Sequence, residues 1–342
     1  MESRSRNEKA DAGKPGSGGL EAVPVGRVVA LCLLLLFPAG ASAQPYPVKP
    51  VRVIVAQAPG NVSDLLIRFL GQKLSEILGQ PLIVDNRPGA GTNIGAEVAA
   101  RTPPDGYSLF VVSAPHAIAP SLYRNLAYDI VRDFAPVSLL GSEPLALVVH
   151  PSLPARSVRE LVTFLKARPG EVSYGSSGNG TVNHLATALF ESRAGVKMVH
   201  VPYKGSVYAI PDALQGVIPV LIANVSVLEP HVRSGRLRAL AVTSSRRVRT
   251  VPDVPTIAES AYPGYEAVNW FGIAAPARTS GDIIMKLNTA IGQAMSLADV
   301  RQFYENRGAD QRTSTPEEMQ LFLRSEITKW AAAVKSSGAR ID

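Results

Sequence analysis

Short apolar runs alternate with polar turns and amphipathic stretches along most of the chain. Runs rich in Val, Ile and Leu that end in a turn containing Gly, Pro, Asn or Ser are typical of buried strands. The predicted strands are residues 51–55, 82–84, 109–112, 145–149, 172–174, 198–201, 220–223, 237–242 and 271–274. Apolar residues at helical spacing predict helices over about 63–78, 92–101, 157–167 and 316–336. Two further helices are predicted to end at Phe190 and at about Leu214.

The first helix carries the clearest boundary signals. Asn61 or Ser63 is placed to cap its N-terminus, and Gly79 stands where a left-handed residue ends a helix. The strand–turn–helix order then repeats, and it starts again after Pro144. This repetition predicts an α/β protein of two lobes with doubly wound, parallel or mixed sheets. The turn-rich segment 246–263 is interpreted as a crossover.

Small polar residues gather at five of the predicted strand–helix turns. These positions are 58–64, 89–93, Ser113, 175–181 and 203–205. The first N–H groups of a helix have no partner within the helix and carry the positive end of its dipole. In open α/β sheets a ligand lies against such helix ends. Each turn alone is equally explained as an ordinary cap, but together they predict a cleft that binds a carboxylate.

The N-terminus has the pattern of an export signal. Residues 28–37 are apolar after a polar, charged segment, and Ala41-Ser42-Ala43 follows as a small-residue cleavage site. The apolar run is much shorter than the roughly 20 residues that span a bilayer. The sequence therefore predicts a signal peptide and N-terminal extension over 1–43, cleavage between Ala43 and Gln44, and a periplasmic protein.

Composition and charge narrow the function classes. The net charge of +7 comes from 35 basic and 28 acidic residues and is spread out, with Arg246-Arg247 and Arg249 as the densest cluster. This distribution argues against nucleic acid as a partner. The single cysteine, Cys32, lies in the predicted signal peptide, so the mature chain is expected to have no disulfide and no Cys-based zinc site.

Catalytic motifs are mostly absent from the sequence. The five histidines show no H-E-x-x-H spacing, and neither G-x-S-x-G nor the phosphate-binding G-x-x-x-x-G-K-[ST] occurs. Residues 89–95 read G-x-G-x-x-x-G, one residue away from the dinucleotide fingerprint. We therefore expect no catalytic residue, no metal and no cofactor. The alternative is an exported hydrolase or isomerase that uses His184 with Ser176 or Ser177, although a packing role for His184 is the simpler interpretation.

A series of motifs extends over most of the chain after the predicted signal. They occupy residues 50–55, 58–60 with Asp64, 81–91, 104–107, 133–137, 174–180, 200–205, 237–243, 252–256 and 270–272. Together these motifs resemble the Bug family, also called the TctC family. Its members are periplasmic solute receptors of tripartite tricarboxylate transporters.

The resemblance implies a two-lobed periplasmic-binding-protein (Venus-flytrap) fold that closes on a small carboxylate. Tricarboxylates, dicarboxylates, amino acids and aromatic acids are the implied ligands. The chain would cross twice, so that lobe one comprises 44–145 plus 264–342 and lobe two comprises 146–263. Carried over motif by motif, the candidate ligand-binding residues are Pro59, Gly60, Ser63, Asp64, Ser113, Ser176, Asn179, Thr181, Tyr203, Lys204 and Gly205.

The implied partners are the membrane subunits of the transporter, with the receptor itself a monomer. A sensor protein is the alternative partner. The first turn departs from the family pattern Gly-Gly-Ser/Thr-Asp, because this chain has Gly60-Asn61-Val62-Ser63-Asp64. Asn61 places a side chain where the second glycine leaves room, and Val62 is apolar where a hydroxyl is common. We expect the change at Asn61 to affect the size and identity of the ligand.

Overall fold

The computed structural model describes residues 46–341, together with Gly13 and Gly16. The predicted signal peptide and its cleavage site lie outside the described residues. Within the described part of the chain, none of the helices combines the length and the hydropathy that a membrane span requires.

The elements follow the alternation predicted from the sequence. The strands are β1 (Val51–Val55), β2 (Leu82–Asn86), β3 (Ser108–Ser113), β4 (Phe134–Val149), β5 (Ser173–Ser176), β6 (Val199–Pro202), β7 (Val220–Asn224), β8 (Arg238–Val242), β9 (Val268–Pro276) and β10 (Asp310–Gln311). The helices are α2 (Val62–Leu78), η1 (Ala90–Thr92), α3 (Asn93–Ala100), α4 (Ala114–Leu122), α5 (Val158–Lys166), α6 (Val182–Ala194), α7 (Ser206–Leu214), α8 (Val225–Arg233), α9 (Ile257–Ser260), α10 (Gly281–Ser296), α11 (Ala298–Glu305) and α12 (Pro316–Ser337).

The strands form one mixed sheet in the order β2-β1-β3-β9-β4-β7-β5-β6, and β8 and β10 pair with β4 off this path. β1 is parallel to β2 and β3, and β5 is parallel to β6 and β7. β4 and β9 run antiparallel to each other and to their neighbours. The predicted doubly wound α/β class is confirmed. The sheets are mixed because the two long central strands carry the chain between its halves instead of closing β–α–β units.

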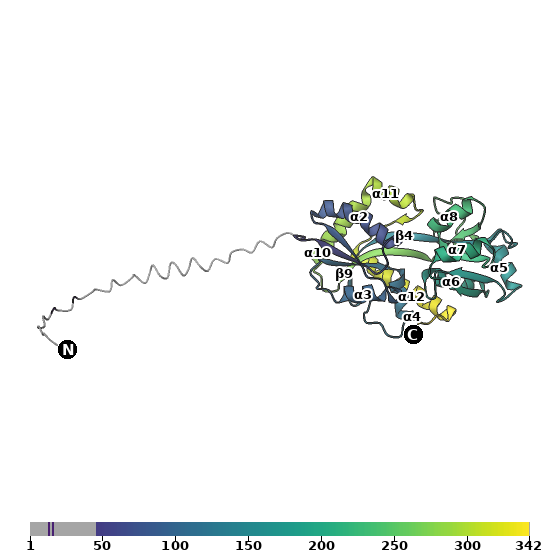
Figure 1. The fold of residues 1–342 in the computed structure, drawn as a ribbon, viewed down its shortest axis with the longest axis horizontal. Helices are drawn as coiled ribbons and strands as arrows, with labels where there is room; N and C mark the ends of the chain where they lie inside the picture. The colour runs from purple at the N-terminus through teal and green to yellow at the C-terminus, as the bar shows by residue number, and fades with distance from the viewer. Residues whose placement is uncertain (1–12, 14–15, 17–45, 342) are drawn as a thin grey trace, which may run out of the picture. The chain divides into compact units, whose positions relative to one another are not determined.

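Strand β4 joins the two halves of the sheet. Its first part, up to Pro144, pairs with β9, and from Leu145 onward it pairs with β7. Figure 1 shows β4 in the middle of the molecule, with α2, α3 and α10 on one side and α5, α6, α7 and α8 on the other. The sequence predicted only the part from residue 145, because prolines and a glycine interrupt the apolar pattern before it. Register shifts beside Pro136 and Gly141 accommodate two of these interruptions.

Gly141 is required where β10 crosses β4. Its φ is +135°, and a Cβ built there would lie 2.2 Å from the Asp310 carbonyl oxygen. A side chain at this position would separate β10 from β4, so glycine permits the close approach of the two backbones.

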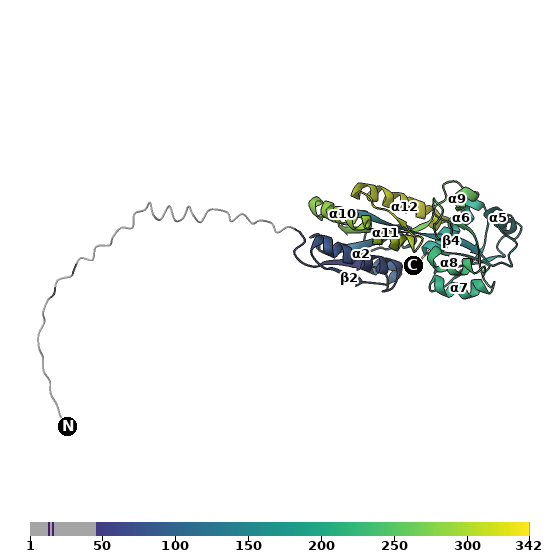
Figure 2. The same ribbon diagram turned by 90° about the horizontal axis from the view of Figure 1, so that it is seen from above.

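Side chains from alternate positions of β1 enter two different cores. Val51, Val53 and Val55 pack with residues of α2 and α10, whereas Ile54 packs with residues of α3, α4 and α12. This period of two buries both faces of the strand and accounts for its continuous apolar run. In the second half, α7 and α8 cover one face while α5 and α6 contribute to the other core. Helix α12 contacts both α4 and α6 and so connects the two halves (Figure 2).

Candidate ligand-binding cleft

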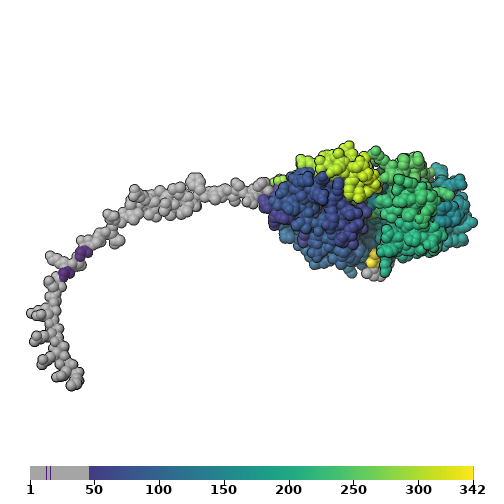
Figure 3. All heavy atoms as spheres, turned by 45° about the horizontal axis from the view of Figure 1, so that its top comes forward, coloured from purple at the N-terminus to yellow at the C-terminus, as the bar shows by residue number. Residues whose placement is uncertain are grey.

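A cavity of about 340 Å³ lies where the two halves meet. Gln57, Thr92 and Ser113 line it from the first half of the sheet, and Asn179 and Ser206 line it from the second. Figure 3 shows the dark blue surface of the first half and the green surface of the second half meeting along a furrow. A ligand in this cavity would contact both halves at once.

Six helices point their N-termini at this cavity. The N-cap residues of α2, α3, α4, α6, α7 and α8 all line it, and they are Asn61, Thr92, Ser113, Thr181, Gly205 and Asn224. Each helix N-terminus offers unpaired N–H donors and the positive end of a dipole. Among the described residues that line the cavity, none carries a charged side chain. The site is therefore built to bind an anion through neutral donors.

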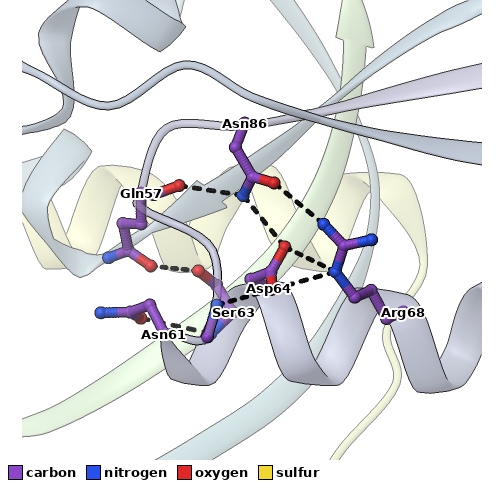
Figure 4. A network of polar contacts seen from close by, with 7 residues as sticks. Gln57, Asn61, Ser63, Asp64, Arg68 and Asn86 are labelled. Atoms are coloured by element: carbon purple, nitrogen blue, oxygen red, sulfur yellow. Dashed lines mark hydrogen bonds and ion pairs between the residues drawn. The ribbon is translucent and has the colours of Figure 1, made fainter.

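The turn between β1 and α2 is held by a polar network (Figure 4). Asp64 is 1% exposed, and its carboxylate accepts hydrogen bonds from the Gly60 N–H at 2.8 Å, Asn86 Nδ2 at 3.0 Å and Arg68 Nε at 3.0 Å. Burial by itself raises the pKa of Asp64, but these hydrogen bonds and the Arg68 charge outweigh it and lower the pKa. Asp64 therefore shapes the turn as an ionised, internally paired group.

The same turn orients Gln57 at the cavity. The Ser63 hydroxyl, 1% exposed, donates to Gln57 Oε1, and Figure 4 shows the Gln57 amide nitrogen pointing away from Ser63. Asn61 accepts a hydrogen bond from the Ser63 N–H, which confirms Asn61 as the predicted cap of α2, and Gly79 ends the helix with φ +69°. Asn61 and Val62, the two departures from the family pattern, both line the cavity.

The turn between β5 and α6 is braced by two histidines that stack on each other. The rings of His184 and His200 lie 3.9 Å apart with an interplanar angle of 6°. His184 Nδ1 accepts the Gly180 N–H at 3.0 Å, and His200 Nε2 lies 2.6 Å from the Ser176 hydroxyl. Burial lowers the pKa of His184 to about 4, with the neighbouring His200 acting in the same direction. Both histidines thus hold the backbone of the turn that carries Asn179 and Thr181.

The structure brings four of the eleven predicted binding residues to the cavity. They are Ser113, Asn179, Thr181 and Gly205. The others lie beside it: Ser63, Asp64 and Ser176 are buried beneath the turns, Pro59, Gly60 and Lys204 are exposed, and the Tyr203 hydroxyl donates to Asp212 at 2.6 Å. Direct contact of any of the eleven residues with a ligand stays a prediction.

Several lining residues were not among those predicted from the sequence. Thr92, Asn183 and Ser206 stand within or next to predicted turns, so their positions at helix N-termini could have identified them. Asn224 ends β7 and is the N-cap of α8, Asn269 and Phe271 lie within β9, and Ile341 is near the C-terminus, so none of the four stood in a turn that the sequence predicted. In the described part of the chain, no group of three or more His, Cys, Asp or Glu side chains is arranged to hold a metal ion.

The Asn179 side chain is expected to contribute directly to binding. Asn179→Ala should weaken the affinity for the bound acid by about 1–3 kcal/mol, because it removes a donor and leaves the partner unpaired. Titration calorimetry of both proteins with the same acid measures this. Asn306→Ala, at the exposed end of α11, is the matched control and should bind like the wild type. Equal affinities for Asn179→Ala and the wild type would exclude the Asn179 side chain from the ligand contact.

Comparison with known proteins defines the class. A family model described as "Tripartite tricarboxylate transporter family receptor", TctC, matches residues 66–339. The chain is therefore a solute-binding receptor of the two-lobed periplasmic-binding-protein fold. It belongs to the TctC family, whose members are receptors and not enzymes, and this sets aside the hydrolase or isomerase alternative.

Individual relatives cover nearly the whole described chain. Protein BugT of Bordetella pertussis is 40% identical over 302 residues, which make up 88% of this chain and 93% of BugT. A solved R. palustris protein with adipate is 34% identical with a TM-score of 0.75, covering 86% of this chain and 100% of that chain. MatC from Rhodopseudomonas palustris with bound malate is 29% identical with a TM-score of 0.72, covering 84% of this chain and 100% of that chain.

Proposed function

We propose that this protein captures a small carboxylate in the periplasm and delivers it to the membrane subunits of a tripartite tricarboxylate transporter. The observation that carries the proposal is the convergence of six helix N-termini on a cavity whose described lining residues carry no charged side chain. The positive ends of the helix dipoles favour an anion there. The adipate and malate bound by two structural relatives support a carboxylate as the ligand.

The proposal includes the organisation of the chain. We infer lobe one from residues 44–145 plus 264–342 and lobe two from residues 146–263. The change of partner along β4, from Val268 opposite Pro144 to Asn224 opposite Leu145, supports a boundary at this point. We also infer export by a signal peptide over 1–43, cleavage between Ala43 and Gln44, and a monomeric receptor.

A panel of carboxylic acids tests the proposed function. The melting temperature of the purified protein is measured with citrate, succinate, adipate, malate, glutamate and phenylacetate. At an acid concentration of about 100 Kd, binding adds about 2.7 kcal/mol to the free energy of unfolding, which raises Tm by about 5 °C.

The neutral diamide or amide of the acid that binds is the matched control for this panel. It should leave Tm unchanged, because it lacks the negative charge that the helix N-termini favour. The proposal fails if no acid raises Tm, or if acid and amide raise it equally.

A further inference from the structure

Glu143 is a buried acidic residue that the binding-site description above leaves unused. It lies in β4 just before the strand changes partner, and it is 2% exposed. It is absent from the residues that line the 340 Å³ cavity, but both Asn224 and Asn269 beside it line that cavity. In the sheet register, Asn269 stands directly opposite Glu143.

The Glu143 carboxyl group takes its partners from the first turn of α8. Its Oε2 accepts a hydrogen bond from Asn224 Nδ2 at 2.6 Å, and its Oε1 accepts one from the Ser226 hydroxyl. On balance the pKa of Glu143 is raised, because burial outweighs the two hydrogen bonds and the charge of Arg307, which act to lower it. Both carboxyl oxygens act as acceptors in this arrangement, and the Asn224 amide turns its nitrogen toward Glu143.

This contact decides what Asn224 offers to a ligand. With Nδ2 engaged by Glu143, the amide directs its Oδ1 away from Glu143, and Oδ1 is a hydrogen-bond acceptor. Glu143 also accepts a hydrogen bond from Ser226, so one carboxyl group holds both polar side chains at the start of α8. At the N-terminus of α8 the Asn224 side chain therefore favours a hydrogen-bond donor on the ligand.

We propose that Glu143 is a positioning residue that sets specificity by holding Asn224 as an acceptor in the cleft. The receptor then selects carboxylates that carry a hydroxyl or ammonium substituent over the unsubstituted acids. A ligand without such a donor leaves Oδ1 unpaired in the closed site, which weakens its binding about 10- to 100-fold. This inference rests on the proposed function and adds to it the chemical class of the ligand.

Matched series of acids test the inference by calorimetric titration. The series are succinate with malate and aspartate, glutarate with 2-hydroxyglutarate and glutamate, adipate with 2-aminoadipate, and phenylacetate with mandelate. In at least one series, the wild type should bind a hydroxy or amino acid at least about tenfold more tightly than the unsubstituted acid. In Glu143→Gln, the Gln amide can donate to Asn224 Oδ1 and reverse the Asn224 amide. The affinity ratio should then fall to about 2 or less.

Two further variants make the result decisive. Glu171→Gln, an exposed site in the second half, is the matched control and should keep the wild-type ratio. Asn224→Ser keeps a residue that is a good N-cap but removes the amide, so the affinity ratio of this variant should also fall to about 2 or less. This variant replaces Glu143→Gln in the test if Glu143→Gln does not fold. General destabilisation would weaken both acids of a series alike and would leave their ratio unchanged.

The inference is overturned if the wild type binds unsubstituted acids as tightly as their hydroxy and amino analogues. It is also overturned if Glu143→Gln, or Asn224→Ser in its place, keeps the wild-type ratio. Equal binding of all members of a series leaves the proposed function standing. Absence of binding by every acid overturns the proposed function and this inference together.

Discussion

Thr181→Asp should abolish carboxylate binding while the protein stays folded. Thr181 is the N-cap of α6, where its hydroxyl accepts the His184 N–H, and it lines the cavity. Aspartate is an equally good N-cap, so the helix keeps its end, and the turn loses only the hydrogen bond that the Thr181 hydroxyl donates to the Gly178 carbonyl at 2.8 Å. Its charge, however, enters a cavity whose described lining residues are all neutral. At a distance of about 5 Å and an effective dielectric constant of about 20, two carboxylates repel each other by about 3 kcal/mol, a loss of more than about 100-fold in affinity.

A second threonine makes a matched control for this experiment. Thr315 caps α12 in the same way, accepting the Glu318 N–H at 3.1 Å, and is exposed outside the cavity. Thr315→Asp introduces the same charge at the same kind of position and should bind the acid like the wild type. Calorimetric titration with the acid that binds the wild type measures both variants, and circular dichroism verifies their fold. Wild-type affinity in Thr181→Asp would show that the ligand does not approach the N-terminus of α6.

The protein should lose stability steeply when the pH falls from about 6.5 to about 4. His116 is 1% exposed, and its Nδ1 accepts the Ser113 N–H at 2.9 Å, just as His184 Nδ1 accepts the Gly180 N–H. Burial lowers the pKa of His116 to about 4, and burial together with His200 lowers that of His184 to about 4. In the unfolded chain both histidines have a pKa near 6.5.

The sign of the pH effect follows from these pKa values. Between pH 6.5 and 4 the unfolded chain binds protons at both histidines and the folded protein does not, so protons favour unfolding. The stabilisation is complete above about pH 6.5 and is lost as the pH falls toward 4, by about 3 kcal/mol for each histidine. Ser113 and Gly180 line the cavity and donate their N–H groups to these rings, so the turns that line the cavity depend directly on the neutral form of both rings.

His116→Gln isolates one of the two contributions. Glutamine at the third position of α4 can form a capping box with Ser113 but does not titrate. Between pH 6.5 and 4, the free energy of unfolding of this variant should fall by about 3 kcal/mol less than that of the wild type. Above pH 7 the two curves should run parallel because the ring is neutral there. Denaturant titrations at a series of pH values measure this, and an identical pH dependence in both proteins would contradict the assignment.

Local patterns were sufficient to predict most elements and several of their ends. Helix α2 begins after Asn61 and ends at Gly79 as predicted, because capping depends on a few neighbouring atoms that the local sequence supplies. No residue range was predicted for helices α4 and α8, and each contains an interior proline, Pro120 and Pro230, whereas α7 was predicted although it contains Pro211. The first part of β4 was missed for the same reason. Packing against the sheet stabilises these elements despite residues that locally disfavour them.

In the candidate site too, some residues could be predicted from local sequence and others depend on tertiary contacts. The polar turns at Ser113, Thr181 and Gly205 could be predicted as parts of a site, since each lies at a strand–helix junction. Ser63, Asp64 and Ser176 stand in equally polar turns, yet their side chains are buried beneath the turn instead of lining the cavity. Which side of a turn a polar residue faces depends on partners far away in the chain, such as Asn86 for Asp64 and His200 for Ser176.

The sequence by itself therefore determined the alternation of strands and helices, the helix caps that end in the cleft, the resemblance to one family and the neutral chemistry of the predicted site. These properties depend on residues close together in the chain. Only the tertiary structure decided that the central strands run antiparallel, that six helix N-termini meet at one cavity, and that Glu143 orients Asn224 there. The reason is physical: hydrogen-bond partners 81 residues apart meet only after the sheet has formed, and no local pattern encodes their contact.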